Sequence, residues 1–371
     1  MSQVAFSARR RGWAIPGLII SLAVSLAIAG AVSAQMVSMP CCAPAEPQDL
    51  TGLSLDELYN MDIVQPNILG GHTHPAGQWM FGYDYMHTTM EGLYQGTHMV
   101  PPSEVFAEGF PVVHIKMDME MQMFDVMQAP TEWLTLMAML PVKYMSMLHQ
   151  EANGATFRQS DAGIGDFEFM GMYTFYGDIR KGGNRLVLNM GLSAPTGRID
   201  ATDYKDGNNH NPLAELEYPM QLGSGTWDPM PGLTYLGDSG KWAWGAQTIE
   251  TIRLGRNYHD YRLGNEYKIS AWDSYAITEW FAPSLRLEGL RWGNISGADP
   301  ALAYNPTPEA RPYLRSGELL NLYMGLNFYL PHGLLKGTRF MLEGGFPVYQ
   351  NLNGPQLGTA WMINAGWTYA F

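Results

Sequence analysis

The stretch Trp361-Met-Ile-Asn-Ala-Gly-Trp-Thr-Tyr-Ala-Phe371, at the end of the sequence, decides the fold class. Every second residue, counted back from Phe371, is aromatic or apolar. The residues between them, from Asn364 to Ala370, are small or polar. Because successive side chains of a strand point to opposite faces, this alternation predicts a strand with one aromatic face and one small, polar face.

This ending resembles the assembly signal of bacterial outer-membrane β-barrels, with Trp367, Tyr369 and Phe371 as the signal residues. The resemblance implies that the closing strand shows its aromatic side chains to lipid. It also implies two partners, the outer-membrane lipid and the barrel-assembly machinery, and a location in the bacterial outer membrane. A soluble β-sandwich is the alternative that the rest of the chain has to exclude.

The amino-terminal residues have the three parts of a secretory signal peptide. Three arginines, 9–11, precede an apolar core, 13–30, and the small residues Val32 and Ala34 stand two apart. This order predicts export with cleavage after Ala34, so that 1–34 is the signal peptide; an uncleaved anchor helix is the alternative. The mean hydropathy of -0.14 argues against a protein that spans a membrane with several helices, which would need further apolar runs of about 20 residues.

We expect residues 35–77 to form a periplasmic tail. Ser54 and Glu57, three residues apart, form a capping box, which predicts a short helix over 54–61. The only two cysteines, at 41–42, are adjacent and cannot staple distant elements. The formal net charge of -13 argues against nucleic acid as a partner.

The segment from Val113 to Met127 shows the clearest period of two. Its apolar residues Ile115, Met117, Met119, Met121 and Met123 alternate with His114, Lys116, Asp118, Glu120 and Gln122. Such a period predicts a strand with one apolar and one wet face. We interpret the methionines as lipid-facing and the polar set as the lining of the lumen.

The connections between extended segments predict the architecture. Residues 78–371 divide into about twelve strands, roughly 78–90, 111–127, 132–147, 163–177, 184–195, 225–237, 241–254, 262–279, 283–295, 316–330, 336–348 and 359–371. Short and long connections alternate, as they do where tight turns face the periplasm and long loops face the outside. The fold class predicted is therefore all-β, a transmembrane antiparallel up-and-down β-barrel of about twelve strands.

Two features argue against the soluble sandwich. Sandwich strands are usually about five to six residues long, whereas these segments exceed even the roughly 9–11 residues that cross a bilayer. Tryptophans also stand near the predicted strand ends, as in the aromatic girdles of a membrane barrel. They are Trp79, Trp133, Trp242, Trp244, Trp272, Trp280, Trp292, Trp361 and Trp367.

Several local motifs carry a family resemblance. They are Gly163-Ile-Gly-Asp-Phe167, Gly191-Leu-Ser-Ala-Pro-Thr-Gly197, Tyr218-Pro-Met-Gln-Leu-Gly-Ser-Gly-Thr226, Pro231-Gly-Leu-Thr-Tyr235 and Pro347-Val-Tyr-Gln-Asn-Leu-Asn-Gly-Pro355. Together with the methionine-rich strands, they resemble the transporter-like outer-membrane proteins grouped with the porin family of the phenol meta-pathway. The resemblance covers most of residues 70–371. It implies passive passage of small solutes, hydrophobic or aromatic ones among them, and brings no cofactor and no catalytic residues.

A barrel of this size is expected to have a narrow lumen, whose selectivity depends on charge and on the width of the constriction. The candidate lumen-lining residues are Asp84, His114, Lys116, Asp118, Glu120, Asp166, Glu168 and Glu343. Two arrangements stay open at this stage. These charges either line a conducting path or pair across the lumen and close it.

Two other functions are weighed against the channel. The 25 methionines, together with His72 and His74, favour an outer-membrane protein that handles soft metal ions such as copper or silver, which thioether and imidazole ligands suit. An outer-membrane hydrolase is the second alternative. The sequence has no Gly-x-Ser-x-Gly motif, and we therefore predict that the protein is not an enzyme.

Overall fold

The computed structural model of the protein describes residues 68–371, apart from 181, 205–212 and 334. The chain divides into two compact units, Met1–Ser54 and Leu55–Phe371, and every described residue belongs to the second. The predicted signal peptide, 1–34, and the predicted helix, 54–61, lie outside the described residues. Within the described residues, no helix combines the length and the apolar character needed to cross a membrane.

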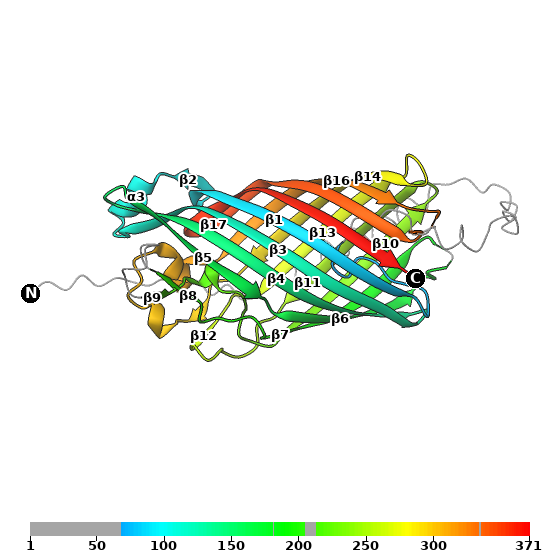
Figure 1. The fold of residues 1–371 in the computed structure, drawn as a ribbon, viewed down its shortest axis with the longest axis horizontal. Helices are drawn as coiled ribbons and strands as arrows, with labels where there is room; N and C mark the ends of the chain where they lie inside the picture. Colours follow the sequence, from blue (N-terminus) through cyan, green and yellow to red (C-terminus); the bar gives the residue numbers. More distant parts are fainter. Residues whose placement is uncertain (1–67, 181, 205–212, 334) are drawn as a thin grey trace, which may run out of the picture. The chain divides into compact units, whose positions relative to one another are not determined.

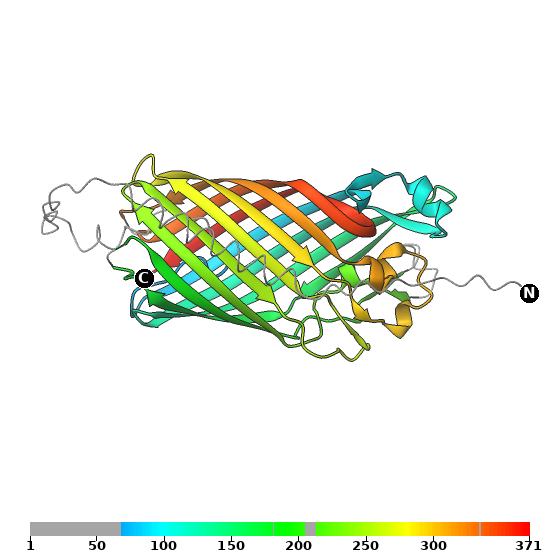
Figure 2. The same ribbon diagram turned by 180° about the vertical axis from the view of Figure 1, so that it is seen from behind.

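The described residues form a closed antiparallel β-barrel (Figure 1). Among them, eleven strand elements make up the wall, each paired with the next: β1 Trp79–Gly96, β3 Val112–Thr131, β4 Leu134–Glu151, β6 Phe167–Tyr176, β7 Arg185–Ala194, β10 Asp228–Ser239, β11 Trp242–Thr251, β13 Glu266–Tyr275, β14 Phe281–Trp292, β16 Gly317–Tyr329 and β17 Thr338–Ala370. Pairing of β17 with β1 closes the ring, which Figure 2 shows from the other side. The predicted fold class is confirmed.

The last element, β17, crosses the wall twice. Its residues 339–352 pair with β16 and its residues 352–370 pair with β1. Directions alternate around an antiparallel ring, so β1 and β16 run in opposite directions. To be antiparallel to both, β17 has to turn back on itself, which it does near Gly354, a residue with φ 97°. With the two legs of β17 and the ten other strands, the described wall is crossed twelve times, as the sequence predicts.

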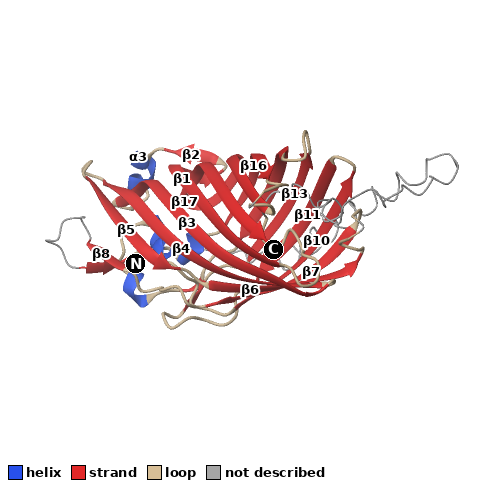
Figure 3. Ribbon diagram, turned by 45° about the vertical axis from the view of Figure 1, so that its right-hand side comes forward, coloured by secondary structure: helices blue, strands red, loops and turns tan. Residues whose placement is uncertain are grey.

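The short elements gather at the end of the barrel that lies opposite the carboxyl terminus (Figure 1). They are β2 His98–Val100, α3 Pro102–Ala107, β5 Thr156–Ile164, β8 Thr202–Tyr204, β9 Leu213–Glu215, β12 Tyr261–Arg262, β15 Ser296–Gly297 and the 3-10 helices η3 Tyr218–Met220, η4 Pro300–Leu302, η5 Pro308–Ala310 and η6 Pro312–Leu314. Figure 3 shows the helices together at this end. We call it the loop end, because the long connections lie there.

The aromatic face of the carboxyl-terminal strand points outward, as predicted. Trp361 is 42% exposed, whereas the neighbouring Met362 is 9% exposed. Trp367 pairs with Tyr83, and Tyr83 pairs in turn with Phe124 of β3. Phe124 is also on the surface, at 47% exposure. The three strands therefore share one apolar outer face.

The height of this outer band matches a bilayer. On β3, Gln128 lies level with Trp79, and Asp118 lies level with Trp361, because both pair with Thr89 of β1. The ten residue-to-residue steps from Gln128 to Asp118, at a rise of about 3.3 Å and a tilt of about 40°, span roughly 25 Å, the height of the apolar band of an outer-membrane barrel.

The interpretation of the β3 methionines as lipid-facing is wrong. Met117, Met119, Met121 and Met123 lie on the face opposite Phe124, which is the inner face. Met117 is 3% exposed and belongs to a buried cluster with Leu216 and Met220, which come from a loop. Segments of chain fill the inside of the barrel, so apolar side chains can be buried there as well as in lipid.

The same finding corrects three lumen candidates. Lys116, Asp118 and Glu120 lie on the outer face, where Asp118 accepts a hydrogen bond from Thr89 (2.9 Å). They lie near or beyond the edge of the apolar band that is closer to the loop end. The outer surface there meets headgroups and water, so polar side chains are favourable on it. His114 does point inward, because a register shift between His114 and Lys116 reverses the alternation.

This placement predicts unequal costs for new charges on one face of β3. Phe124→Lys near the middle of the band is expected to lower the free energy of unfolding by ~2–4 kcal/mol, whereas Glu120→Lys near its edge costs ~0–1 kcal/mol. Urea unfolding of each variant in lipid vesicles measures the difference. Equal costs would contradict the assigned position of the bilayer.

Candidate functional site

A stretch ahead of the first strand lies inside the barrel. We call Ile68–Pro75 the interior segment. The hydrogen bonds that join it to the wall include Gln247 Nε2 to the Leu69 carbonyl (2.9 Å), Thr234 Oγ1 to the Gly70 carbonyl (3.4 Å) and the His74 amide to Thr135 Oγ1 (3.1 Å). These wall residues come from β11, β10 and β4, so the segment reaches several strands. The sequence placed this stretch in a periplasmic tail, and the structure places it in the lumen.

Methionine packs around the interior segment. Ile68 belongs to a buried cluster with Met80, Met127, Met137, Met139, Met170, Met172, Val187, Met230, Leu236, Ile249 and Trp272. Gly70 fits at φ 64°, and a Cβ there would come within 2.6 Å of the Met170 sulfur. Methionine is unbranched and fills irregular gaps, which suits the space between a wall and a strand-less segment.

A charge network crosses the inner wall between β14 and β17. Arg286 donates to both carboxylate oxygens of Glu343, at 3.0 and 2.5 Å, and to Glu288 at 2.7 Å. Its guanidinium also lies over the Tyr323 ring, 3.7 Å from the centroid. Asn364 donates to Glu343 as well, at 3.1 Å. The sequence left open whether inward charges line a conducting path or pair across the lumen. In this part of the lumen they are paired.

The other inward candidates lie on the wall or support a loop. Asp84 shares the inner face with Met123, and Glu168 shares it with Met139. Asp166 accepts hydrogen bonds from the amides of Gly197 (3.0 Å) and Ser224 (2.7 Å). Asp166 is therefore an anchor for the connection between β7 and β10 more than a lining residue.

That connection folds back into the barrel. We call its described residues, 195–204 and 213–227, the inward loop. Lys143 of β4 donates to the Leu222 carbonyl at 3.0 Å. Gly197 and Gly223 bring the two ends of the loop together, since a Cβ on Gly197 would lie 2.8 Å from the Gly223 Cα. The wall and the inward loop are thus held together by charged side chains and close backbone contact.

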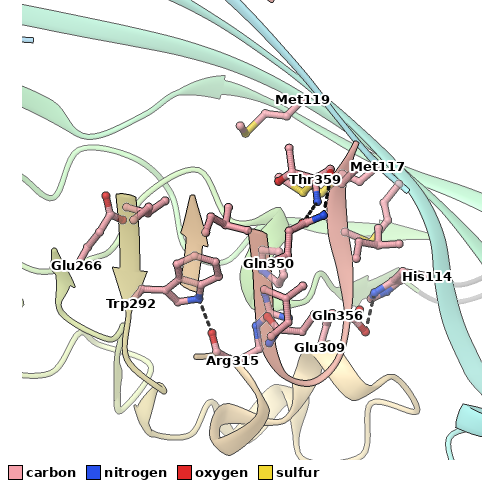
Figure 4. A pocket seen from close by; sticks show the side chains of 17 residues that line it. His114, Met117, Met119, Glu266, Trp292, Glu309, Arg315, Gln350, Gln356 and Thr359 are labelled. Carbon is pink, nitrogen blue, oxygen red and sulfur yellow. Dashed lines mark hydrogen bonds and ion pairs between the residues drawn. The ribbon is translucent and has the colours of Figure 1, made fainter. Parts of the chain in front are cut away.

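A cavity of about 320 Å³ remains inside the barrel near the loop end (Figure 4). Its apolar lining comes from Met90, Met117, Met119, Met147, Pro219, Leu290, Leu319, Leu352 and Leu357. Its polar lining comes from His114, Glu266, Glu309, Arg315, Gln350, Gln356 and Thr359, all of which Figure 4 labels. Most of the lining is therefore apolar, and the polar residues include Glu266 on the side away from His114 (Figure 4).

His114 and Glu309 of this lining belong to a buried cluster of histidines and carboxylates. His114 and His149 face each other across β3 and β4, with ring centroids 4.5 Å apart. Glu217 of the inward loop lies 3.8 Å from His114 Nε2, and Glu309 lies 2.7 Å from His114 Nδ1. Burial alone would raise the pKa of Glu217, but the two histidines beside it lower that pKa to about 2. Glu217 is therefore ionised despite its burial.

The sequence pointed to His114, and the methionine-rich clusters of the soft-metal alternative also included His149, next to Met145 and Met147. It did not point to Glu217 or Glu309, which lie in long connections between strands. Arg286 was missed because the alternation of β14 mixes charged and apolar residues on both faces. The signals that would have found them are buried charge and strand register, which a sequence without contacts does not contain.

His72 and His74, the sequence's metal candidates, belong to the interior segment. Their rings are 5.1 Å apart and nearly perpendicular. Among the described residues, groups of three or more potential metal ligands occur elsewhere, at His114, His149 and Glu217 and at Glu215, His259 and Asp299. A soft-metal role for His72 and His74 stays a prediction.

The comparisons with known proteins concern the fold. No family model matches this chain, and no curated protein matches it. Its structure is similar to an outer membrane channel from Pseudomonas putida F1, with a TM-score of 0.58, 15% identity and coverage of 83% of this chain and 100% of that chain. The transport unit of the autotransporter AIDA-I from Escherichia coli gives a TM-score of 0.46, 10% identity and coverage of 85% and 96%. The first likeness, with the apolar outer band, identifies the fold as that of a bacterial outer-membrane barrel.

Proposed function

We propose that this protein is an outer-membrane channel for small solutes with an apolar body, aromatic compounds among them, and that the conformation described above is its closed state. The observation that carries the proposal is the methionine- and leucine-lined cavity of about 320 Å³, which is of the size that small-molecule sites have. Transfer of an apolar solute from water to such a lining is favourable, and the polar residues of the lining can bind a polar substituent of the solute.

The closed state follows from what fills the lumen. The interior segment lies within the ring of buried methionines, and the inward loop closes the other end against β3 and β4. A solute passes only if one of these two parts moves. The interior segment is the simpler candidate, because it is held to the wall by a few hydrogen bonds and by apolar packing.

The resemblance to transporter-like proteins of the phenol meta-pathway group supports the same class of solute. The soft-metal alternative has no added support from the site geometry around His72 and His74. A hydrolase would need a nucleophile activated by a base within hydrogen-bond reach, and turnover of ester or peptide substrates by the purified protein would reveal it. Contact of the barrel-assembly machinery with Trp367, Tyr369 and Phe371 remains part of the proposal.

Permeation tests the proposal directly. Purified protein in vesicles with a lipopolysaccharide outer leaflet is expected to speed the entry of a phenol-sized aromatic solute above that of protein-free vesicles, and Met119→Trp, which fills the cavity, is expected to slow it. Met99→Trp is the matched control, because Met99 is 64% exposed on β2. Equal entry with and without protein, for the wild type and for a variant lacking the interior segment, would refute the channel.

A further inference from the structure

We propose that His114, His149 and Glu217 bind a divalent transition-metal ion, Zn²⁺ by the nature of the ligands, which fastens the inward loop to the barrel wall. The two imidazoles come from neighbouring strands, β3 and β4, and the carboxylate comes from the loop. One ion held by all three would therefore join two parts of the chain that are otherwise linked by polar contacts and packing.

The geometry suits such an ion. One ligand atom from each of the three residues lies within 4.8 Å of the others. Glu217 Oε1 lies 3.8 Å from Nε2 of His114, and Glu217 Oε2 lies 4.0 Å from Nε2 of His149. With metal bonds of about 2.0–2.2 Å, two tetrahedral zinc ligands lie roughly 3.4 Å apart. From a separation of at most 4.8 Å, the ligand atoms have to close by about 1.4 Å or less.

Burial without hydrogen bonds is the second, independent observation. His114 and His149 are 0% exposed and Glu217 is 3% exposed. Within the described residues, Nε2 of each histidine and Oε2 of Glu217 make no hydrogen bond. A buried polar atom left in that condition costs about 1–3 kcal/mol. The three side chains lie close enough for one cation to bind them together.

Outer groups approach the ligands. Glu309 Oε2 lies 2.7 Å from His114 Nδ1, in the position of the outer carboxylates that orient metal-binding histidines. Thr307 Oγ1 and Asn305 Nδ2 donate to Glu217 Oε1 at 3.2 and 3.1 Å. One carboxylate oxygen is thus occupied and the other is available to a metal.

Ligand type selects the ion. Two imidazoles and one carboxylate are the ligands of many zinc sites, whereas a soft monovalent ion such as Ag⁺ prefers sulfur.

Equilibrium dialysis of the full, folded protein in detergent, first stripped with a chelator, tests the site. One equivalent of Zn²⁺ is expected to bind, and His149→Ala and Glu217→Gln are each expected to weaken binding by at least about 100-fold. Glu309→Gln, which removes the outer group, is expected to weaken it by about 10–100-fold. Folding of each variant is checked by the gel mobility of unboiled against boiled protein.

Two controls make the test specific. His98→Ala removes an exposed histidine of β2 and is expected to leave binding unchanged. His259→Ala removes the centre of the other ligand group, where His259 already bonds Asp299 at 2.6 Å, and is also expected to leave it unchanged. Absence of Zn²⁺ binding, or binding that His149→Ala and Glu217→Gln leave intact, overturns the proposal. This readout does not depend on permeation, so it can fail while the channel function stands, and the reverse.

Discussion

Joining residue 34 directly to Ala76, so that the interior segment is removed, is expected to turn a barrel that carries almost no current in planar bilayers into a conducting one. The segment provides Ile68 to the methionine cluster and its carbonyls to Gln247 and Thr234. Without it, the methionines nearest the carboxyl-terminal end face an unfilled space, which water and ions can enter. The wall itself stays closed, because β1 and β17 pair beyond Ala76.

A point variant distinguishes displacement of the interior segment from its removal. Gly70→Leu keeps the segment but places a Cβ 2.6 Å from the Met170 sulfur, at a backbone φ of 64° that a leucine rarely adopts. We expect frequent channel openings. Gly240→Leu is the matched control, since Gly240 has φ 60° with nothing within 4 Å of a Cβ, in a turn outside the lumen. If the truncated protein carries no current, the inward loop closes the lumen alone and the interior segment is not the gate.

The strands themselves could be predicted from the sequence. A period of two over long segments and alternating short and long connections follow from crossing a bilayer with a closed sheet. Trp272 and Trp292, which the sequence placed among the aromatic girdles, instead face the inside of the barrel. The outward direction of Trp361 and Trp367 was also predicted correctly, because the aromatic residues of this strand alternate with small or polar ones. The two legs of β17 were predicted as well, as 336–348 and 359–371, whereas β5, which pairs with β4 outside the ring order, was not.

The direction of the methionines could not be predicted in the same way. Met119 and Met121 suit lipid and a packed interior equally well, since both environments are apolar. The rule that polar residues face the lumen assumes a water-filled lumen, and this one is filled by the interior segment and the inward loop. On β3 the rule fails further because Asp118 and Glu120 stand where the outside is no longer lipid.

The candidate site needed information that no local pattern holds. His114 faces inward because of one register shift on β3, and its partner Glu309 lies far along the chain, in a loop that folds over the barrel. Glu217 reaches the same place from a different loop. Motifs report neighbours along the chain, whereas this cluster is made by four segments, the strands β3 and β4 and two loops, that meet only in the folded barrel.

Arg286→Ala is expected to lower the free energy of unfolding by ~3–5 kcal/mol, measured by urea titration in lipid vesicles. Arg286 is 7% exposed and is the hydrogen-bond donor that Glu343 and Glu288 share. Its removal leaves Glu343, itself 2% exposed, as a buried negative charge with only Asn364 as a donor. The large cost comes from this uncompensated charge more than from the attraction that is lost.

Two further variants show whether the charge is the cause. Arg291 lies on the same strand, β14, and pairs with Glu318 at 3.3 Å with both side chains well exposed. Arg291→Ala is expected to cost only ~0–1 kcal/mol, since solvent screens exposed pairs. Adding Glu343→Gln to Arg286→Ala is expected to recover a large part of the stability, because a glutamine side chain leaves no uncompensated charge in the barrel. A double variant as unstable as Arg286→Ala alone would instead assign the loss to the packing of the guanidinium on Tyr323, 3.7 Å away.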